Sequence, residues 1–288
     1  MYSVCILNYN DCKTTIELIK LVSQYASVNN IVVVDNASTD NSYNELIKFA
    51  GTKIHILKSD KNGGYGYGNN IGVMYCYNIL HEKYVAICNP DIIVKEESLK
   101  ACCAYLERHQ DTTIAVPQML DRNGDVVEEC VWPIQTGLQY LCFSLKIVGF
   151  LFNKKYSFNT NNVVEVDCVA GSLLVIDTES FIKYGLYDEN IFLFCEETVL
   201  GIKLKNRKRK SVLIKDNTFI HYHSVSINKN IQSQLTQKKI MWESRLYVLK
   251  EYYKWNRFQM VFAKIISKIC LFEEYLVLNK DRIKGESI

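Results

Sequence analysis

The stretch YVAICNPDIIV at residues 84–94 places a polar triplet between two apolar runs. Residues 84–88 have the aromatic and β-branched composition of a buried strand, and a second such run follows the triplet. Pro90 fixes its own φ angle and pushes Asn89 toward extended geometry, so the break is stiff. A buried carboxylate without a partner carries a large desolvation penalty. We therefore expect Asp91 to be presented to a partner in a defined place.

The first 117 residues alternate short β-branched runs with stretches whose apolar residues recur at helical spacing. This βαβα order predicts an α/β fold with a mostly parallel sheet and helices on both faces. In such sheets, ligands bind at the carboxyl ends of the strands, where the strand order reverses. The predicted strands are SVCILNYN, NIVVVDN, KIHILKS, YVAICNPD and TTIAVP, and the predicted helices are KTTIELIKLVSQYA, NSYNELIKFA, GNNIGVMYCYNIL and KEESLKACCAYLERH.

Polar residues gather at the ends of three of these strands. Turn chemistry alone accounts for any single strand end, because Asn and Asp favour turns for their own backbone reasons. Three strands that each deliver polar side chains to one edge favour a ligand site over coincidence. The residues are Tyr9 and Asn10 after the first strand, Asp35 and Asn36 after the second, and Asn89 with Asp91 after the fourth.

The glycine-rich stretch NGGYGYGNNIG at residues 62–72 does not fit the nucleotide fingerprints. Its glycines miss the G-x-G-x-x-G spacing, and the sequence contains no G-x-x-x-x-G-K-[ST]. Several backbone N–H groups that enter a helix nevertheless suit a diphosphate or a ribose. A flexible loop before a helix is the alternative.

Composition limits the class of protein. The 288 residues are 48% apolar and 23% charged, as in an ordinary globular protein, and a net charge of +3 does not argue for nucleic acid. The eleven cysteines are odd in number and form no C-x-x-C pair, so we expect a reducing compartment rather than disulfides or structural zinc. The start MYSVCILNYN lacks the basic region of a signal peptide, and no apolar run is long enough to span a membrane.

The pattern changes in the second half of the chain. DRNGDVV indicates a hairpin, and VVEVDCVAGSLLVID predicts a strand pair that Gly171 and Ser172 interrupt; HYHSVS is expected to be a loop. From Lys229 onward the chain predicts helices, with twelve basic against six acidic residues. We therefore predict one domain over residues 1–228 and a helical, basic and aromatic extension over residues 229–288.

A second group of candidate residues lies in YDENIFLFCEETVLGIKL. Glu196 and Glu197 follow a strongly apolar run and begin a helical pattern, where the helix dipole favours carboxylates. A simple charge at a helix start is the alternative. Some 24 residues further on, HYHSVS supplies two histidines. His, Asp and Asn side chains together can hold a divalent ion of the Mn or Mg kind that bridges a diphosphate.

In this order and spacing, these stretches resemble the inverting family-2 glycosyltransferases, especially the bacterial branch that builds surface polysaccharides. They cover residues 4–226, over three quarters of the chain. The resemblance implies a GT-A fold, in which a Rossmann-like mixed sheet flanked by helices binds a nucleoside-diphosphate sugar. The matching stretches are ILNYN, VVVDNASTDNS, KNGGYGYGNNIG, ICNPDIIV, GSLLVI, GLYDENIFLFCEE and HYHSVS.

The resemblance also assigns roles on the donor side. It implies that Asp35 contacts the pyrimidine base with Tyr9 stacking nearby, and that Asn69 stands where many relatives carry Arg. Asn89 and Asp91 match the D-x-D motif in its N-P-D form, so Asp91 would point at a metal–diphosphate. The donor-binding residues that the matching stretches imply are Asn8, Tyr9, Asn10, Asp35, Asn36, Gly64, Asn69, Asn89 and Asp91.

On the metal and acceptor side, the resemblance implies that His221 joins Asn89 and Asp91 at a divalent cation, Mn²⁺ or Mg²⁺. Glu196 and Glu197 match the family's E-D pair, whose second member is the catalytic base. Such a base deprotonates an acceptor hydroxyl, and the metal neutralises charge on the leaving diphosphate. The residues assigned to the acceptor side are Gly171 and Ser172.

Two departures from the family pattern leave alternatives open. The usual pair is Glu-Asp, whereas this chain has two glutamates, so either Glu196 or Glu197 could be the base. The metal motif carries one Asp where D-x-D has two, which predicts modest metal affinity, and His223 could replace His221.

The expected function is therefore metal-dependent, inverting transfer of a hexose. The length and the N-P-D form look most like rhamnosyltransferases that use dTDP-rhamnose, with a saccharide or lipid-linked saccharide acceptor in capsule, O-antigen or cell-wall synthesis. UDP-galactose or UDP-N-acetylglucosamine as donor is the alternative, and an inactive sugar-binding or scaffold protein is a further one. We expect a cytoplasmic protein. The extension would contact an anionic membrane surface, pack on the domain, or pair with a second subunit in a homodimer.

Overall fold

The computed structural model describes residues 1–142, 161–222 and 233–285. The chain forms two compact units. Unit 1 is drawn from Met1–Ile134, Lys155–Phe192 and Glu196–Asn230, and unit 2 is drawn from Gln135–Lys154, Leu193–Cys195 and Ile231–Ile288. The predicted division of the chain after residue 228 stays a prediction.

Unit 1 is built on one mixed sheet, with nine strands among the described residues. Its strands are β1 (Tyr2–Asn8), β2 (Val28–Asp35), β3 (Ile54–Lys58), β4 (Tyr84–Cys88), β5 (Ile92–Val94), β6 (Thr112–Leu120), β8 (Val163–Val166), β10 (Leu173–Asp177) and β11 (Lys210–His221), and β7 (Val131–Trp132) and β9 (Cys168–Val169) form a separate pair. The order is β3-β2-β1-β4-β10-β6-β11-β5, and β8 also pairs with β11. The first four strands in this order, β3, β2, β1 and β4, are parallel to one another. Strand β10 is antiparallel to both of its neighbours, β4 and β6.

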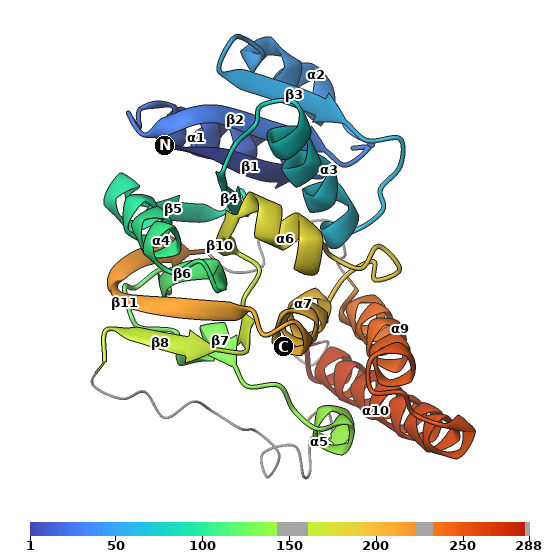
Figure 1. The fold of residues 1–288 in the computed structure, drawn as a ribbon. Helices are drawn as coiled ribbons and strands as arrows, with labels where there is room; N and C mark the ends of the chain where they lie inside the picture. Colours follow the sequence, from blue (N-terminus) through green and yellow to red (C-terminus); the bar gives the residue numbers. More distant parts are fainter. Residues whose placement is uncertain (143–160, 223–232, 286–288) are drawn as a thin grey trace. The chain divides into compact units, whose positions relative to one another are not determined.

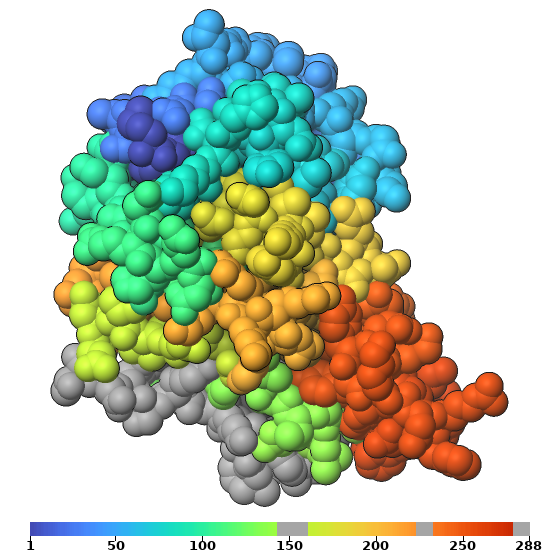
Figure 2. Space-filling view, in the orientation of Figure 1, coloured from blue at the N-terminus to red at the C-terminus, as the bar shows by residue number. Residues whose placement is uncertain are grey.

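Helices cover both faces of this sheet. Figures 1 and 2 show α3, α4 and α6 on the side that faces the viewer, and Figure 1 shows α1 behind β1 and β2. The predicted α/β fold with a mixed sheet and flanking helices is confirmed. The helices of unit 1 are α1 (Cys12–Ser23), α2 (Ser42–Leu46), α3 (Tyr65–Asn78), α4 (Glu96–Arg108), α6 (Thr178–Tyr184) and α7 (Glu196–Asn206), with short 3₁₀ turns η1 (Ile47–Phe49) and η2 (Glu128–Cys130).

The central strands form the core because helices cover them on both sides. Val32, Val33 and Val34 of β2 are completely buried, as are Val85 and Ile87 of β4. A strand that is buried on both faces needs a continuous apolar run rather than an alternating one. The polar residues that follow these runs are thereby carried to the carboxyl edge of the sheet.

Two predictions about the second half of the chain were wrong. The stretch VVEVDCVAGSLLVID is three strands, not a strand pair, and they pair with different partners: β8 with β11, β9 with β7, and β10 with β4 and β6. The loop predicted at HYHSVS begins later, because β11 continues through His221, which lies opposite Ile92 of β5. The antiparallel pairing with β5 extends β11 beyond its apolar run.

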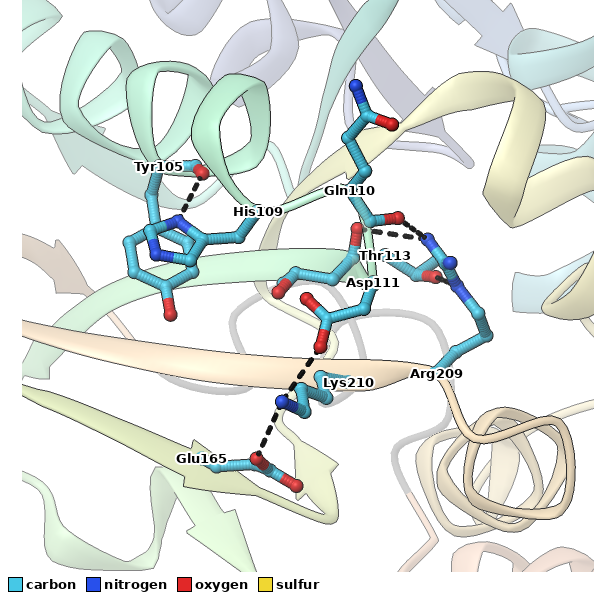
Figure 3. Close-up of polar contacts among 9 residues, drawn as sticks. Tyr105, His109, Gln110, Asp111, Thr113, Glu165, Arg209 and Lys210 are labelled. Atoms are coloured by element: carbon cyan, nitrogen blue, oxygen red, sulfur yellow. Dashed lines mark hydrogen bonds and ion pairs between the residues drawn. The ribbon is translucent and has the colours of Figure 1, made fainter.

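The opposite, amino-terminal edge of the sheet is held by charged and polar contacts (Figure 3). Lys210 Nζ lies 2.8 Å from Asp111 Oδ2 and 3.7 Å from Glu165 Oε2. Arg209 Nη2 donates to the Gln110 carbonyl at 2.6 Å, and its Nε donates to Thr113 Oγ1 at 3.0 Å. These contacts join the starts of β6 and β11, so the polar groups at this edge are engaged in structure.

Unit 2 consists of α5 (Gly137–Cys142), α9 (Gln234–Glu251), α10 (Arg257–Gly285) and the short segment Leu193–Cys195. Trp242 and Leu249 of α9 are buried, and Ser244 Oγ donates to the Leu193 carbonyl at 2.8 Å. The Arg245 guanidinium lies over the ring of Tyr140, 4.8 Å from its centroid. Over the described part of the chain, no helix has both the length and the apolar composition needed to cross a membrane.

Candidate active site

A buried hydrogen-bond cluster joins the ends of β1 and β2. Asp35 Oδ1 accepts hydrogen bonds from Asn8 Nδ2 at 2.8 Å and from Ser38 Oγ at 2.6 Å. Its Oδ2 accepts from the backbone N–H of Ser38 at 3.1 Å. Asn8 and Asp35 are both completely buried. The structure thus brings these two predicted donor residues together, and both carboxylate oxygens of Asp35 accept hydrogen bonds within the protein.

Two further predicted donor residues lie beside this cluster. Asn10 donates its backbone N–H to Ser38 Oγ at 2.9 Å, and its side-chain oxygen accepts from the Thr39 N–H at 2.8 Å. Asn10 has a left-handed φ of 51°, which turns the chain sharply after β1. Tyr9 is partly exposed at the same turn. Stacking of Tyr9 on a base stays a prediction.

The glycine-rich loop is fixed between two parts of unit 1. Asn36 Nδ2 donates to the Gly64 carbonyl and to Asn62 Oδ1, both at 3.0 Å. Gly64 has a φ of 91°, and a Cβ there would lie 2.0 Å from the Phe192 carbonyl oxygen. Tyr65 donates its backbone N–H to that same carbonyl at 3.0 Å. Only glycine fits at Gly64, so the loop is ordered by contacts rather than being a flexible connection.

Asn69 lies in the second turn of α3 and is 1% exposed. Its Nδ2 donates to the Tyr65 carbonyl at 3.0 Å, one helical turn earlier. Its Oδ1 is buried and has no hydrogen-bond partner among the described residues. A buried acceptor without a donor is costly, so Asn69 has the unused hydrogen-bonding capacity expected at a ligand site.

The N-P-D turn brings Asp91 to His221. Asp91 Oδ1 lies 3.3 Å from His221 Nε2, and both residues are buried. The pairing of β5 with β11 produces this contact, and the Tyr222 N–H donates to the Asp91 carbonyl at 3.0 Å. Asn89 is partly exposed, and its backbone N–H donates to the Ser172 carbonyl at 2.8 Å. The N-P-D turn is therefore held to Ser172, which precedes β10, and to the end of β11, and it brings Asp91 and His221 together.

The chemistry of Asp91, His221 and Asn89 fits a hard divalent cation. Among the described residues, no group of three or more His, Cys, Asp or Glu side chains could hold a metal ion. Mg²⁺ is usually bound by one or two protein carboxylates together with waters and substrate phosphates, so a small protein set is sufficient. His223, the alternative ligand, lies outside the described residues.

Glu196 and Glu197 are the first two residues of α7, as predicted. Glu196 is 3% exposed, and its Oε1 has no hydrogen-bond partner among the described residues. Burial, together with the neighbouring charge of Glu197, raises the pKa of Glu196 well above its ordinary value. Burial also raises the pKa of Glu197, although a hydrogen bond from the Gly171 N–H to its Oε1, at 3.3 Å, opposes this rise. Glu197 remains partly accessible to solvent.

Tyr65 is a site residue that sequence reasoning missed. Its hydroxyl donates to the Gly171 carbonyl, while the Gly171 N–H donates to Glu197. The Tyr65 ring meets the Tyr187 ring edge to face, with centroids 5.5 Å apart. The available signal was its position, since Tyr65 directly follows Gly63-Gly64 and begins α3.

Gly171 and Ser172 connect the two parts of the site. The Ser172 carbonyl accepts from Asn89 of the N-P-D turn, and Gly171 contacts both Tyr65 and Glu197. The Ser172 hydroxyl is buried without a hydrogen-bond partner among the described residues. The dipeptide therefore fixes the base candidate relative to the metal-ligand candidates, all within unit 1.

Comparison with known proteins identifies the class of the chain. Residues 3–176, more than half of the chain, match the family described as "Glycosyl transferase family 2". This chain belongs to that family.

Two relatives are similar over part of the chain. The low-salt glycan biosynthesis hexosyltransferase Agl10 of Haloferax volcanii is 30% identical over 198 residues, which cover 68% of this chain and 58% of the relative. The rhamnosyltransferase WbbL of Escherichia coli is 27% identical over 150 residues, which cover 49% of this chain and 54% of the relative. The match thus spans somewhat more than half the length of each relative.

Two solved structures have a similar fold. The structure of GalNAc-T7 with UDP, GalNAc and Mn²⁺ aligns with a TM-score of 0.63 at 15% identity, covering 88% of this chain and 48% of the other. The mannosyltransferase PcManGT from Pyrobaculum calidifontis, in complex with GDP-Man and Mn²⁺, aligns with a TM-score of 0.57 at 11% identity, covering 95% and 74%. At these identities the likeness concerns the fold, and unit 1 has the GT-A fold that the sequence predicted.

Proposed function

We propose that this chain transfers a hexose, with inversion, from a nucleoside-diphosphate sugar to an acceptor hydroxyl. The observation that carries this proposal is the linked set Asn89, Ser172, Gly171 and Glu197. The Ser172 carbonyl accepts a hydrogen bond from the N-P-D turn, and the Gly171 N–H donates one to the Glu197 carboxylate, so both are held to the same dipeptide. A metal–diphosphate group and a general base are needed on opposite sides of the reacting carbon, and this arrangement supplies residues for both.

In the proposed reaction, Glu197 accepts the proton of the acceptor hydroxyl as its oxygen attacks the anomeric carbon. The bond between that carbon and the diphosphate oxygen breaks, and the nucleoside diphosphate leaves with the electron pair. Gly171 and Tyr65 hold Glu197 in position. Glu196 carries the more deeply buried carboxyl, and we assign it a supporting part in orienting the acceptor or a neighbouring group.

Asp91, Asn89 and His221 would hold a Mg²⁺ or Mn²⁺ ion, which would offset the negative charge on the leaving diphosphate. Two of the similar structures are described with Mn²⁺ and a nucleotide, which supports a divalent cation here. On the donor side, we assign the base and ribose to the edge formed by Tyr9, Asp35 and the glycine-rich loop.

The specific donor that we propose is dTDP-rhamnose. Its support is the N-P-D form of the motif and the similarity to a rhamnosyltransferase. UDP-galactose and UDP-N-acetylglucosamine are the alternative donors, and a saccharide or lipid-linked saccharide of a surface polysaccharide is the proposed acceptor. A protein that binds sugars without catalysis is the second candidate, and the presence of both the base and the metal carboxylates argues against it.

A donor screen tests the proposal. The purified chain is heated with each nucleotide sugar in the presence and absence of Mn²⁺, and slow donor hydrolysis is measured in parallel. Binding raises the melting temperature by mass action, so one donor should raise it most, and only with the metal. Asp91→Ala should lose this shift, whereas Glu179→Ala, an exposed acid in the first turn of α6, should keep it. A shift that Asp91→Ala retains with Mn²⁺ present would refute the metal-site assignment.

Activity and stereochemistry need a second measurement. With the donor identified, the anomeric configuration of the product is read by NMR, and the proposal requires the configuration opposite to that of the donor. Donor binding without hydrolysis or transfer to any saccharide would favour the non-catalytic sugar-binding protein.

A further inference from the structure

Helix α10 is apolar on two opposite sides. One side is buried in unit 2, and Ala263, Ser267 and Cys270 on it are at most 6% exposed. These residues follow each other at intervals of four and three, as expected for a helix face that packs on a neighbour. The buried residues of α9, including Val248 and Leu249, belong to the same unit.

The other side of α10 carries six large apolar side chains that are exposed. We call this set the α10 seam. Its members are Phe258 (86% exposed), Phe262 (50%), Ile265 (52%), Ile269 (45%), Phe272 (60%) and Leu276 (50%). A contiguous exposed apolar strip of this kind is unusual on a monomer and marks a surface that is covered by something else.

The spacing of the α10 seam is that of a coiled coil. Successive members lie 4, 3, 4, 3 and 4 residues apart, from Phe258 to Leu276. This is the a/d pattern of the heptad, with Phe262, Ile269 and Leu276 at a positions and the other three at d positions. An apolar face that only lies on a core drifts with the 3.6-residue turn, whereas a strict alternation of four and three suits a second helix that runs alongside.

The charges beside the seam indicate what the second helix is. Lys268 falls at a g position and Glu273 at the next e position, five residues later. In a parallel pair of identical helices, each g residue meets the e residue of the following heptad on the other helix. Two-fold symmetry would thus form two Lys268–Glu273 pairs, and neither residue has an ion pair within the described part of the chain.

Neither an antiparallel helix pair nor a membrane surface provides favourable partners for both Lys268 and Glu273. An antiparallel pair sets g residues beside g residues. Those available to Lys268 are Val261, Lys268 and Tyr275 of the second copy, and none is a carboxylate. An anionic bilayer would attract Lys268 but repel Glu273, which flanks the same seam. We therefore propose that the α10 seam binds the α10 seam of a second copy of this chain, as a parallel two-helix coiled coil.

The mass of the full-length protein in solution tests this proposal. Light scattering after size-exclusion chromatography should give twice the mass of one chain, which is 33.3 kDa. Ile269→Asp places a charge in the middle of the seam and should yield a monomer at the same concentration. Val277→Asp, which makes the same kind of change at an exposed position outside the seam, should remain a dimer. A wild-type monomer at 50 µM, or equal masses for the two variants, would overturn the proposal.

A charge exchange tests the parallel orientation. Lys268→Glu and Glu273→Lys should each weaken the dimer, by about tenfold or less in the dissociation constant for exposed pairs. The double variant should regain wild-type affinity, because it restores both cross-helix pairs. If the double variant is as weak as the single ones, the helices are not parallel. Sedimentation with phosphatidylglycerol vesicles is the last experiment. If the wild type is a monomer that sediments with the vesicles, and Ile269→Asp does not, the α10 seam binds a membrane rather than a second copy.

Discussion

Asp35 and Glu196 are both buried carboxylates of unit 1, and their surroundings are opposite. Asp35 is completely buried, and its two oxygens accept three hydrogen bonds from Asn8 and Ser38. Glu196 is 3% exposed, and its Oε1 has no partner among the described residues. Its neighbour Glu197 adds a like charge rather than a compensating one, which contributes to the raised pKa of Glu196.

These different surroundings indicate different roles for the two buried acids. A carboxylate with its hydrogen bonds satisfied holds the end of β1 and the loop that follows β2 in place, so its removal should damage the fold. A pair whose pKa values are raised costs stability at neutral pH, and such pairs are concentrated at functional sites. We therefore expect Asp35 to matter first for stability and Glu197 to matter first for catalysis.

The largest expected effect is on catalysis by Glu197→Gln. Loss of a general base lowers the rate of transfer by about 10²–10⁴-fold, and single-turnover kinetics with saturating donor measure this loss. Donor affinity should be kept, and the melting temperature should not fall. Glu196→Gln should be milder, and Glu179→Gln, an acid in the first turn of the short helix α6, serves as the matched control. If Glu196→Gln is inactive while Glu197→Gln transfers sugar at the wild-type rate, the roles of the two glutamates are reversed.

The next effect in size is on the stability of the strand-end cluster. Asp35→Ala leaves buried donors on Asn8 and Ser38 without an acceptor, which should lower the free energy of unfolding by about 3 kcal/mol. Urea unfolding measures the loss against Asp125→Ala, an exposed acid whose removal should be almost neutral. An Asp35→Ala protein as stable as the wild type would mean that the cluster does not hold this edge.

The glutamate pair predicts a dependence of stability on pH. Because both pKa values are raised, the folded protein keeps protons that the unfolded chain releases above about 4.5. The free energy of unfolding therefore falls as the pH rises from 4.5 through the raised pKa, by up to about 1.4 kcal/mol per pH unit for each proton. The side chain introduced by Glu196→Gln cannot ionise. The free energy of unfolding of this variant should therefore fall less steeply with pH, and at pH 8 it should exceed that of the wild type. Parallel declines of the two proteins would mean that the glutamate pair does not cause the decline.

The smallest effect concerns Tyr65. Tyr65→Phe removes only the hydroxyl that donates to the Gly171 carbonyl, a hydrogen bond worth about 1 kcal/mol. If this bond positions Glu197, the transfer rate should fall about tenfold or less while donor affinity is unchanged. Tyr77→Phe on the exposed side of α3 is the control and should transfer at the wild-type rate. A fall in donor affinity instead would place Tyr65 on the donor side.

Much of the site could be predicted because it depends on local patterns. The buried runs of β1, β2 and β4 end where the polar residues begin, and parallel strands bring their carboxyl ends together. Asn8 and Asp35 therefore meet at the carboxyl edge of the sheet, and Asn36 follows directly. The start of α7 at Glu196 likewise follows from the return of a helical pattern after an apolar run.

The rest depends on contacts between residues that are distant in the chain. The stretch from Val163 to Asp177 has a strand-like composition that only Gly171 and Ser172 interrupt. Tertiary pairing divides it into three strands with different partners. His221 ends a strand because β5 is present opposite it, not because its own neighbours favour a strand. The bond from Tyr65 to Gly171 spans 106 positions, so no local pattern indicates it.

The central claim is that Asp35 is a structural acid and Glu197 a catalytic one. The most direct measurement compares Asp35→Asn and Glu197→Gln, two isosteric changes, for transfer rate per folded molecule and for free energy of unfolding in the same preparations. We expect Glu197→Gln to be at least as stable as the wild type and to lose transfer. Asp35→Asn should lose stability and bind the donor more weakly, while its folded fraction retains transfer at saturating donor. A Glu197→Gln protein that is destabilised but transfers sugar normally would contradict this claim.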